Sequence, residues 1–272
     1  MVRGSPLSLM LERLERLSPL DQSDREAILA LPHTLRTVQA EEFIIWEGDR
    51  VESSCLLRDG VVCRHKIAEG GRQIVSVHMR GDFVNLQNSL LKTADHNVQA
   101  LTRAEIALIP CRAIVALASA RPAVALAMWL DTLIDGAIFR EWIANIGRRD
   151  ARARIAHILC EFALRQERAG LGTRGQYELP LSQEQLGDAL GLTPVHINRT
   201  LKALEAGGLI SRERRRLTIA DWEALSGVGD FDASYLYLEL TEPPETDDPD
   251  SRVSQHAGGI PNRCDQGAAG AL

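Results

Sequence analysis

The alternation of apolar and polar positions marks residues 35–110 as β-rich. Short runs such as FIIWEGD and QIVSVHMRGDF are separated by Gly-containing turns. This pattern is typical of antiparallel strands joined by tight turns. Two short amphipathic helices are predicted before it, over 7–17 and from Ser23, with a capping pair to Glu26 and an end at Pro32. We expect an antiparallel β-roll behind a helical N-terminal segment.

Helical periodicity follows over 112–119 and then over a long segment, 121–146, which carries Pro122 in its first turn. Apolar side chains cover more of the long helix than the single stripe of an ordinary surface helix. Either one side packs on the roll and the other on a second chain, or the whole helix lies in an internal core. We prefer the homodimer. The interface residues that we assign are Leu126, Leu130, Leu133, Ile134, Ala137 and Ile138.

Two helices joined by a tight turn are predicted within residues 181–219, LSQEQLGDALGLTPVHINRTLKALEAGGLISRERRRLTI. Ser182 and Gln185 have the spacing of a capping box, which starts the first helix at the residue after Ser182. Gly191 follows the last turn of that helix, where a positive φ is usually needed. The sequence therefore predicts a helix over 183–190 that ends in a short turn.

The second helix begins at Thr193, an N-cap residue, and has Pro194 in its first position. Gly207 and Gly208 end it. Three of its apolar side chains share one face, which we expect to pack on a core. They are Ile197, Leu201 and Leu204. The polar side chains of this helix therefore point away from the core.

A basic segment, LISRERRRLTI, follows the second helix and predicts two short strands that form a wing. A helix-turn-helix places its second helix in the DNA major groove, where Arg199 can contact guanine or phosphate and Asn198 can pair with adenine. The alternative is an ordinary helical hairpin with a solvated polar face, but the caps, the turn and the basic wing occur together. The residues that we assign to DNA contact are Ser182, Gln183, Thr193, Pro194, Val195, His196, Asn198, Arg199, Lys202, Arg212, Arg214, Arg215 and Arg216.

The distribution of charge supports this interpretation, although the total does not. The 272 residues carry a net charge of −6, which is unusual for a protein that binds nucleic acid. Residues 148–216 hold 13 basic and 8 acidic residues, a net of +5, whereas residues 229–272 hold 2 basic and 9 acidic, a net of −7. A basic segment is thus followed by an acidic tail. Because the tail is also rich in Pro and Gly, we expect it to be disordered.

Several classes of protein are excluded by composition and motifs. The chain is 45% hydrophobic and 25% charged, as is usual for a soluble globular protein. It has neither a signal-peptide core nor an uncharged membrane span, so we expect a cytoplasmic protein with no membrane contact. The five cysteines are scattered and form no CxxC pair, which argues against disulfides and zinc. Nucleophile-elbow, Walker and metal motifs are absent, so we expect no enzyme activity.

The order of roll, long helix and winged helix-turn-helix resembles the Crp/Fnr family of bacterial transcription regulators. The most specific part is LSQEQLGDALGLTPVHINRTLKALEAGGLI, and RGDF at 80–83 resembles the Gly-Asp/Glu-Phe turn of the family. The resemblance covers roughly residues 20–225. It implies an α+β fold with a jelly-roll-like antiparallel β-roll, a dimerisation helix and a C-terminal winged helix-turn-helix. The domains are then a sensory domain over 1–145, a DNA-binding domain over 146–226 and an acidic tail over 227–272.

The resemblance also implies a function. The roll would sense a signal, and a homodimer would bind a palindromic promoter site in double-stranded DNA, with RNA polymerase as a further partner of an activator. In the family an Arg-Glu pair commonly precedes the last Arg of the recognition helix. Here Pro194 and Val195 stand at those positions and only Arg199 matches, so the DNA half-site should differ. The alternative is a ligand-sensing regulatory module whose C-terminal domain contacts proteins, and the basic wing favours DNA.

Cofactor binding is not expected. Family members that bind cyclic nucleotides carry a Glu and an Arg-Ser pair after the Gly-Asp-Phe turn, but here Leu86 falls at the Glu and Ala94 and Asp95 lie near the Arg-Ser. A cyclic phosphate buried without a cation would be costly, Asp95 would repel it, and no Arg occurs between Gly81 and Arg103. Lys92 is the one alternative cation in this segment.

Iron–sulfur members of the family hold the cluster with several cysteines near the N-terminus, whereas no cysteine here precedes Cys55. Haem is not expected either, because single histidines in strands are usually structural. The histidines concerned are His65, His78 and His96. A reactive thiol at Cys63 or Cys111 is equally unsupported, since buried cysteines are mostly inert.

Overall fold

The computed structural model of the chain describes residues 5–69 and 71–238. Two short helices, α1 (Ser8–Glu15) and α2 (Gln22–Leu29), lead into the strands. The cap of α2 differs from the expected one. The Asp21 carboxylate, and not the Ser23 hydroxyl, accepts the capping hydrogen bond, from the backbone N–H of Asp24 at 2.8 Å. Asp and Ser cap helices about equally well, so the sequence pattern placed the start of this helix too late.

Seven strands within the described residues form the N-terminal roll, in two antiparallel sheets of order β1-β7-β3 and β2-β6-β4-β5. They are β1 (Thr34–Val38), β2 (Phe43–Ile45), β3 (Ser53–Asp59), β4 (Val62–Ala68), β5 (Gly71–His78), β6 (Asn97–Ala100) and β7 (Ala104–Pro110), with a 3-10 turn η1 (Leu86–Ser89) after β5. Gly60 joins β3 to β4 at a φ of +89°, and a Cβ there would lie 2.5 Å from the carbonyl oxygen of Arg103. The predicted β-roll is therefore confirmed.

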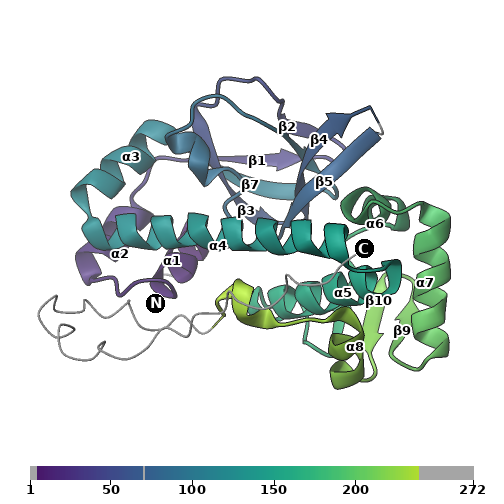
Figure 1. Cartoon of the computed structure of the whole chain (residues 1–272). Helices are drawn as coiled ribbons and strands as arrows, with labels where there is room; N and C mark the ends of the chain where they lie inside the picture. The colour runs from purple at the N-terminus through teal and green to yellow at the C-terminus, as the bar shows by residue number, and fades with distance from the viewer. Residues whose placement is uncertain (1–4, 70, 239–272) are drawn as a thin grey trace, which may run out of the picture.

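Helix α3 (Cys111–Ala120) leads into α4 (Pro122–Arg148), which runs along the roll toward the C-terminal part of the molecule (Figure 1). By length and composition alone, α4 could cross a membrane. Its two central carboxylates are instead paired with arginines of the same chain. Asp131 pairs with Arg13 of α1, and Asp135 pairs with Arg64 of β4 at 2.6 Å. One side of α4 therefore packs on the chain's own polar and apolar groups.

The apolar surface of α4 is divided between the chain's own core and solvent. Ala137 is only 6% exposed, and Leu130, Ile134 and Ile138 pack against clusters of the same chain. Of these four predicted interface residues only Ala137 is buried in the single chain, whereas Leu130, Ile134 and Ile138 are partly exposed, so their place in a dimer interface stays a prediction. Leu126 is half-buried. The large apolar side chains that α4 leaves exposed are Trp129, Leu133 and Ile143, at 66%, 51% and 71%.

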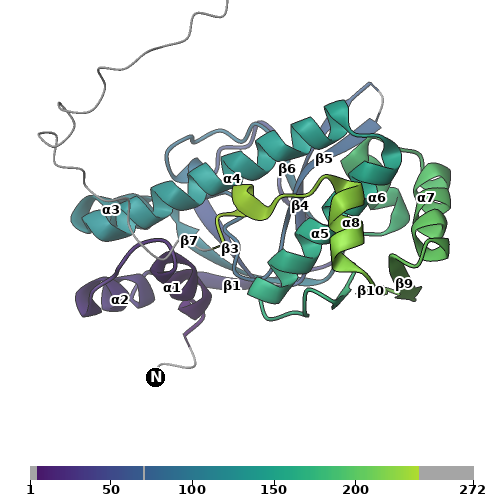
Figure 2. The same ribbon diagram turned by 60° about the horizontal axis from the view of Figure 1, so that its bottom comes forward.

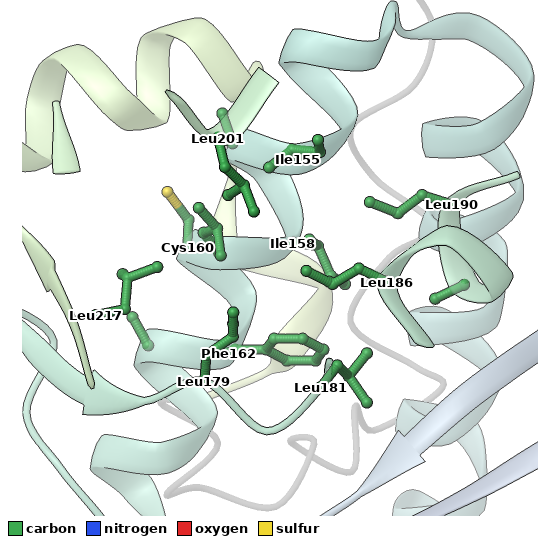
Figure 3. Packing of buried hydrophobic residues seen from close by; sticks show 14 of the residues in the cluster. Ile155, Ile158, Cys160, Phe162, Leu179, Leu181, Leu186, Leu190, Leu201 and Leu217 are labelled. Carbon is green, nitrogen blue, oxygen red and sulfur yellow. The ribbon is translucent and has the colours of Figure 1, made fainter. Parts of the chain in front are cut away.

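The C-terminal part packs around α5 (Ala151–Arg168), beneath one end of α4 (Figures 1 and 2). Its other elements are β8 (Gln176–Glu178), α6 (Gln183–Leu190), α7 (Pro194–Ala206), β9 (Ile210–Glu213), β10 (Arg216–Ile219), α8 (Trp222–Gly229) and the 3-10 turn η2 (Ala233–Leu236). Phe162, Leu186, Leu201 and Leu217 meet in one fully buried core (Figure 3). Two helices and a three-stranded sheet of order β8-β10-β9 thus form the predicted winged helix-turn-helix.

Packed structure continues beyond residue 226, where the sequence placed the end of the domain. The Tyr235 hydroxyl donates a hydrogen bond to Glu161 Oε2 at 2.8 Å, and the rings of Phe231 and Tyr235 lie against His157 of α5. Because these aromatic residues are surrounded by Asp and Gly, the composition of the segment did not indicate that it packs on the domain. The rest of the expected disordered tail, 239–272, lies outside the described residues.

Candidate nucleic-acid interface

Helix α6 and the turn after it are built as the sequence predicted. The Ser182 hydroxyl accepts a hydrogen bond from the Gln185 backbone N–H at 3.2 Å, and the Gln185 side chain accepts one from the Ser182 N–H at 2.9 Å. Gly191 ends the helix at a φ of +66°. A Cβ on Gly187 would lie 2.5 Å from the carbonyl oxygen of Leu192, so a glycine lets the turn fold back closely on α6. The turn thereby fixes where α7 starts.

Helix α7 has one buried and one outward face. The Thr193 hydroxyl caps it by accepting a hydrogen bond from the His196 N–H at 3.3 Å, and Gly208, at a φ of +73°, follows its end. The predicted core-facing side chains are all fully buried. They are Ile197, Leu201 and Leu204. Burial of these three side chains fixes the rotation of α7 about its own axis. It thereby determines which side chains of α7 face solvent.

The outward face of α7 carries most of the predicted contact residues. Val195 is 80% exposed, and Arg199 and Lys202, four and seven positions later, are exposed on the same side. His196 and Asn198 flank this face and are half-buried. The side chains on this face can contact a thymine methyl group, the edge of a guanine and a phosphate.

Four further predicted DNA-contact residues lie at the N-termini of α6 and α7. Ser182 and Gln183 are exposed at the N-terminus of α6, and Thr193 and Pro194 are exposed at that of α7. The hydroxyl oxygens of Ser182 and Thr193 already accept capping hydrogen bonds. Their exposed backbone ends remain suited to phosphate oxygens, because the partial positive charge of a helix is at its N-terminus.

Two of the four arginines of the wing are paired with carboxylates of the protein. Arg212 Nε and Nη2 donate to Glu205 at 3.0 and 2.8 Å, and these hydrogen bonds lower the pKa of the Glu205 carboxyl. Arg215 pairs with Glu178 at 3.0 Å and also donates to the carbonyl oxygens before α6. Arg212 and Arg215 thus have partners within the protein, and their contact with DNA stays a prediction.

Arg214 and Arg216 are the wing cations that stay available. Both are exposed, and within residues 5–69 and 71–238 neither forms an ion pair. Arg214 lies in the turn between β9 and β10, at the tip of the hairpin, with a φ of +57°. In both views α7 forms one outer edge of the molecule, with α6 and the wing on either side (Figures 1 and 2). The helix that carries Arg199 and Lys202 therefore lies beside the hairpin that carries Arg214 and Arg216.

The interior of the roll holds a buried cation that the sequence pattern did not reveal. Arg64 is 2% exposed; its Nε donates to the carbonyl oxygen of Val84 at 2.6 Å, and its guanidinium lies 5.6 Å from the ring centre of Phe139. Arg64 precedes the Gly-Asp-Phe turn in the sequence, and only the fold brings β4 alongside the segment after that turn. Because Asp135 already pairs with Arg64, this cation is not free for a phosphate. The absence of cyclic-nucleotide binding stays a prediction.

Histidines and cysteines of the roll are packed as structural groups. Burial lowers the pKa of His78 well below its ordinary value, and a ring nitrogen lies 2.9 Å from Ser76 Oγ. Burial raises the pKa of the Cys63 thiol to about 12 and also raises that of Cys111. Among the residues that the structure describes, no three His, Cys, Asp or Glu side chains are grouped to hold a metal ion. The predictions about iron–sulfur clusters and haem remain untested.

Comparison with known proteins matches both halves of the chain. A sequence profile for the Crp-like helix-turn-helix domain matches residues 153–228, and one for the cyclic nucleotide-binding domain matches residues 35–121. The transcriptional activator protein FnrL of Cereibacter sphaeroides is 31% identical over 200 residues, covering 70% of this chain and 78% of that protein. A probable transcriptional activator of Rhizobium leguminosarum is 28% identical over 196 residues, 71% of this chain and 80% of that protein.

Solved structures share the same fold. FixK2 from Bradyrhizobium japonicum superposes with a TM-score of 0.66 at 24% identity, covering 73% of this chain and 98% of that one. A mutant of CooA from Carboxydothermus hydrogenoformans gives a TM-score of 0.60 at 18% identity, over 80% of this chain and 95% of that one. At these identities the likeness concerns architecture. It agrees with a roll, a long helix and a winged helix-turn-helix in this order.

Proposed function

This chain belongs to the Crp/Fnr family and is a DNA-binding transcription regulator rather than an enzyme, and from that premise we propose that it acts as a homodimer on an inverted-repeat site in promoter DNA. The observation that carries the proposal is the single surface formed by the outward face of α7 and the tip of the wing. A two-fold pair of such surfaces reads two half-sites about one helical turn apart, or a multiple of it.

Helix α7 enters the major groove with its N-terminal half against base edges. Arg199 donates two hydrogen bonds to a guanine or grips a phosphate, and Val195 meets a thymine methyl. His196 and Asn198 contribute at the flanks. Arg214 and Arg216 contact phosphates beside the groove, which positions the domain without reading sequence. Since Val195 replaces a charged residue common in the family, the half-site differs from that of members with the charged pair.

The dimer interface runs along the solvent-facing side of α4. This side follows the alternating spacing of three and four residues that is typical of a coiled coil. The positions concerned are Leu126, Trp129, Leu133, Gly136, Arg140 and Ile143. The three large apolar side chains that this side exposes, Trp129, Leu133 and Ile143, support pairing with the same side of a second chain. Sedimentation of the purified chain tests this pairing.

The cell compartment and a further partner follow from the same premise. A regulator of bacterial promoters works in the cytoplasm, where the chromosome lies. The FnrL protein is named a transcriptional activator and the Rhizobium leguminosarum protein a probable one, and activation requires contact with RNA polymerase. We include RNA polymerase as a proposed partner.

The proposal is tested by incubating the purified, ligand-free full chain with sheared DNA from its host, recovering the bound fragments and sequencing them. We expect an inverted repeat with half-site centres about 10 bp or a multiple apart. Only random fragments whose recovery falls steeply with salt would contradict sequence-specific reading by the ligand-free protein. Recovery of no DNA at all would contradict the assigned surface.

A further inference from the structure

A cavity of about 140 Å³ lies where α1, the turn after β5, α4 and α5 meet. Six arginines line it, and they come from both the N-terminal and the DNA-binding parts of the chain. They are Arg13, Arg16, Arg64, Arg80, Arg165 and Arg168. Four carboxylates line it as well, so the arginines are in excess.

The inner arginines are fully engaged. Arg13 Nη1 lies 2.7 Å from Asp82 Oδ1 and also pairs with Asp131. Arg165 Nη2 lies 3.0 Å from Asp82 Oδ2, and its Nη1 lies 3.0 Å from Glu161. Burial opposes ionisation of Asp82, but the two guanidinium groups outweigh it and hold the pKa of Asp82 below its ordinary value. This inner layer is therefore a closed network with no capacity for a ligand.

The outer arginines have no such partners. Arg16, the C-cap residue of α1, is three residues after Arg13, and Arg168, the last residue of α5, is three residues after Arg165, so each lies about one turn farther along its helix. Within residues 5–69 and 71–238 neither forms an ion pair, and Arg168 donates only a long hydrogen bond, 3.4 Å, to the carbonyl oxygen of Tyr237. Burial, and then the nearby charges of Arg16 and Arg13, lower the pKa of Arg168.

Two guanidinium groups that face the same cavity repel each other unless an anion lies between them. We propose that this cavity binds a small anion with phosphate or carboxylate groups, held between Arg16 and Arg168, with Arg80 at the rim. Planar guanidinium groups bind both kinds of oxyanion through paired hydrogen bonds. The anion would connect α1 to α5, and so would hold the DNA-binding part in its present orientation against the N-terminal part.

The test is calorimetric titration of the full chain with inorganic phosphate and, separately, with citrate, at an ionic strength held constant with sodium chloride. We expect saturable binding of one anion per chain by at least one of the two. The double variant Arg16→Gln/Arg168→Gln should bind at least tenfold more weakly. The matched control Arg103→Gln/Arg112→Gln removes two exposed arginines of the roll and α3 and should bind as the parent does.

Four outcomes would overturn the proposal. One is the absence of saturable binding, and another is unchanged affinity in the Arg16/Arg168 variant. The third is loss of binding in Arg199→Gln/Arg216→Gln instead, which would place the anion on the DNA-binding surface. The acid-rich sequence 239–250 begins directly after Leu238, which lines the cavity. Binding that appears only after its carboxylates are changed to amides would show that the chain supplies its own anion, and would also contradict the proposal.

The anion site does not depend on the proposed DNA reading. Specific DNA binding by the Arg16→Gln/Arg168→Gln variant can be measured separately, so that failure of one proposal is distinguishable from failure of the other.

Discussion

Arg212 and Arg216 have the same chemistry and belong to the same hairpin, but the fold gives them different partners. Glu205 of α7 accepts two hydrogen bonds from Arg212, whereas Arg216 is exposed. The sequence predicted a basic wing correctly, since that depends only on composition. It could not predict which arginine is free, because the competing carboxylates of Glu205 and Glu178 reach the wing only through tertiary packing. Contact assignments by residue type are therefore less secure than the motif that contains them.

Arg199→Ala should weaken binding to the recovered site at least tenfold, because a guanidinium that pairs with a base edge contributes about 1–3 kcal/mol of discrimination. Binding to unrelated DNA should change much less, and the unfolding midpoint should stay the same, since this side chain is exposed. Fluorescence anisotropy with both DNAs measures the two affinities. Arg103→Ala, an exposed change on the roll, is the control, and an equal decrease on both DNAs would contradict base reading by Arg199.

Arg214→Ala/Arg216→Ala should reduce the slope of log affinity against log salt by about 2, because two fewer phosphates are neutralised by the wing. The comparison variant Arg212→Ala/Arg215→Ala removes the same number of charges from the same hairpin. It should leave the slope nearly unchanged and lower stability instead, because these arginines pair with the protein. Equal slopes for the two variants would contradict the division of the wing arginines into two that contact phosphates and two that pair within the protein.

At the scale of elements, caps and glycines determined what the sequence could predict. The bounds of α6 and α7 agree with the pattern of Ser182, Gln185, Thr193 and Gly208, because these residues act on their own backbone neighbours. Helix α4 was predicted in extent but not in orientation. Its periodicity shows apolar residues on several faces and does not say which face the roll will cover.

Trp129→Asp/Leu133→Asp should convert the dimer to a monomer, since two buried carboxylates facing their symmetry mates would be repelled and desolvated. Both side chains are exposed in the single chain, so each chain should keep its fold. Sedimentation velocity at micromolar concentration measures the change, and circular dichroism checks the fold. Leu90→Asp, at a side chain that is 75% exposed in the loop after β5, is the matched control. A persistent dimer would place the interface elsewhere.

At the scale of the whole molecule, polar contacts join the roll to the DNA-binding part. Arg72 of β5 lies 2.7 Å from Asp188 of α6, and Asp82 of the turn after β5 lies 3.0 Å from Arg165 of α5. The partners are 116 and 83 residues apart in the chain, beyond the reach of any local pattern. The sequence predicted the order of the parts and missed the contacts between them. The extension with Phe231 was missed for the same reason.

Stability should fall as the pH is lowered below about 6.5, the ordinary histidine value. Burial lowers the pKa of His78 and of His157, so the folded chain keeps both neutral while the unfolded chain takes up protons. Their contribution is complete above pH 6.5 and is lost as the pH falls toward their folded values, at up to about 1.4 kcal/mol per pH unit for each. Urea unfolding at pH 7.5, 6.5 and 5.5 measures it. His78→Gln should show a shallower dependence, and an unchanged slope would contradict this role.

The most direct measurement of the central claim is the affinity of the full chain for its recovered site as the spacing between half-sites is varied. An insertion of 5 bp turns one half-site to the opposite side of the duplex, so a dimer that reads both major-groove segments cannot contact them together. We predict at least a hundredfold weaker binding with an insertion of 5 bp. We predict partial recovery with 10 bp, because about one full turn returns both half-sites to the same side of the duplex. Affinity that is independent of spacing would mean that each chain reads its DNA alone, and would contradict a symmetric dimer as the reading unit.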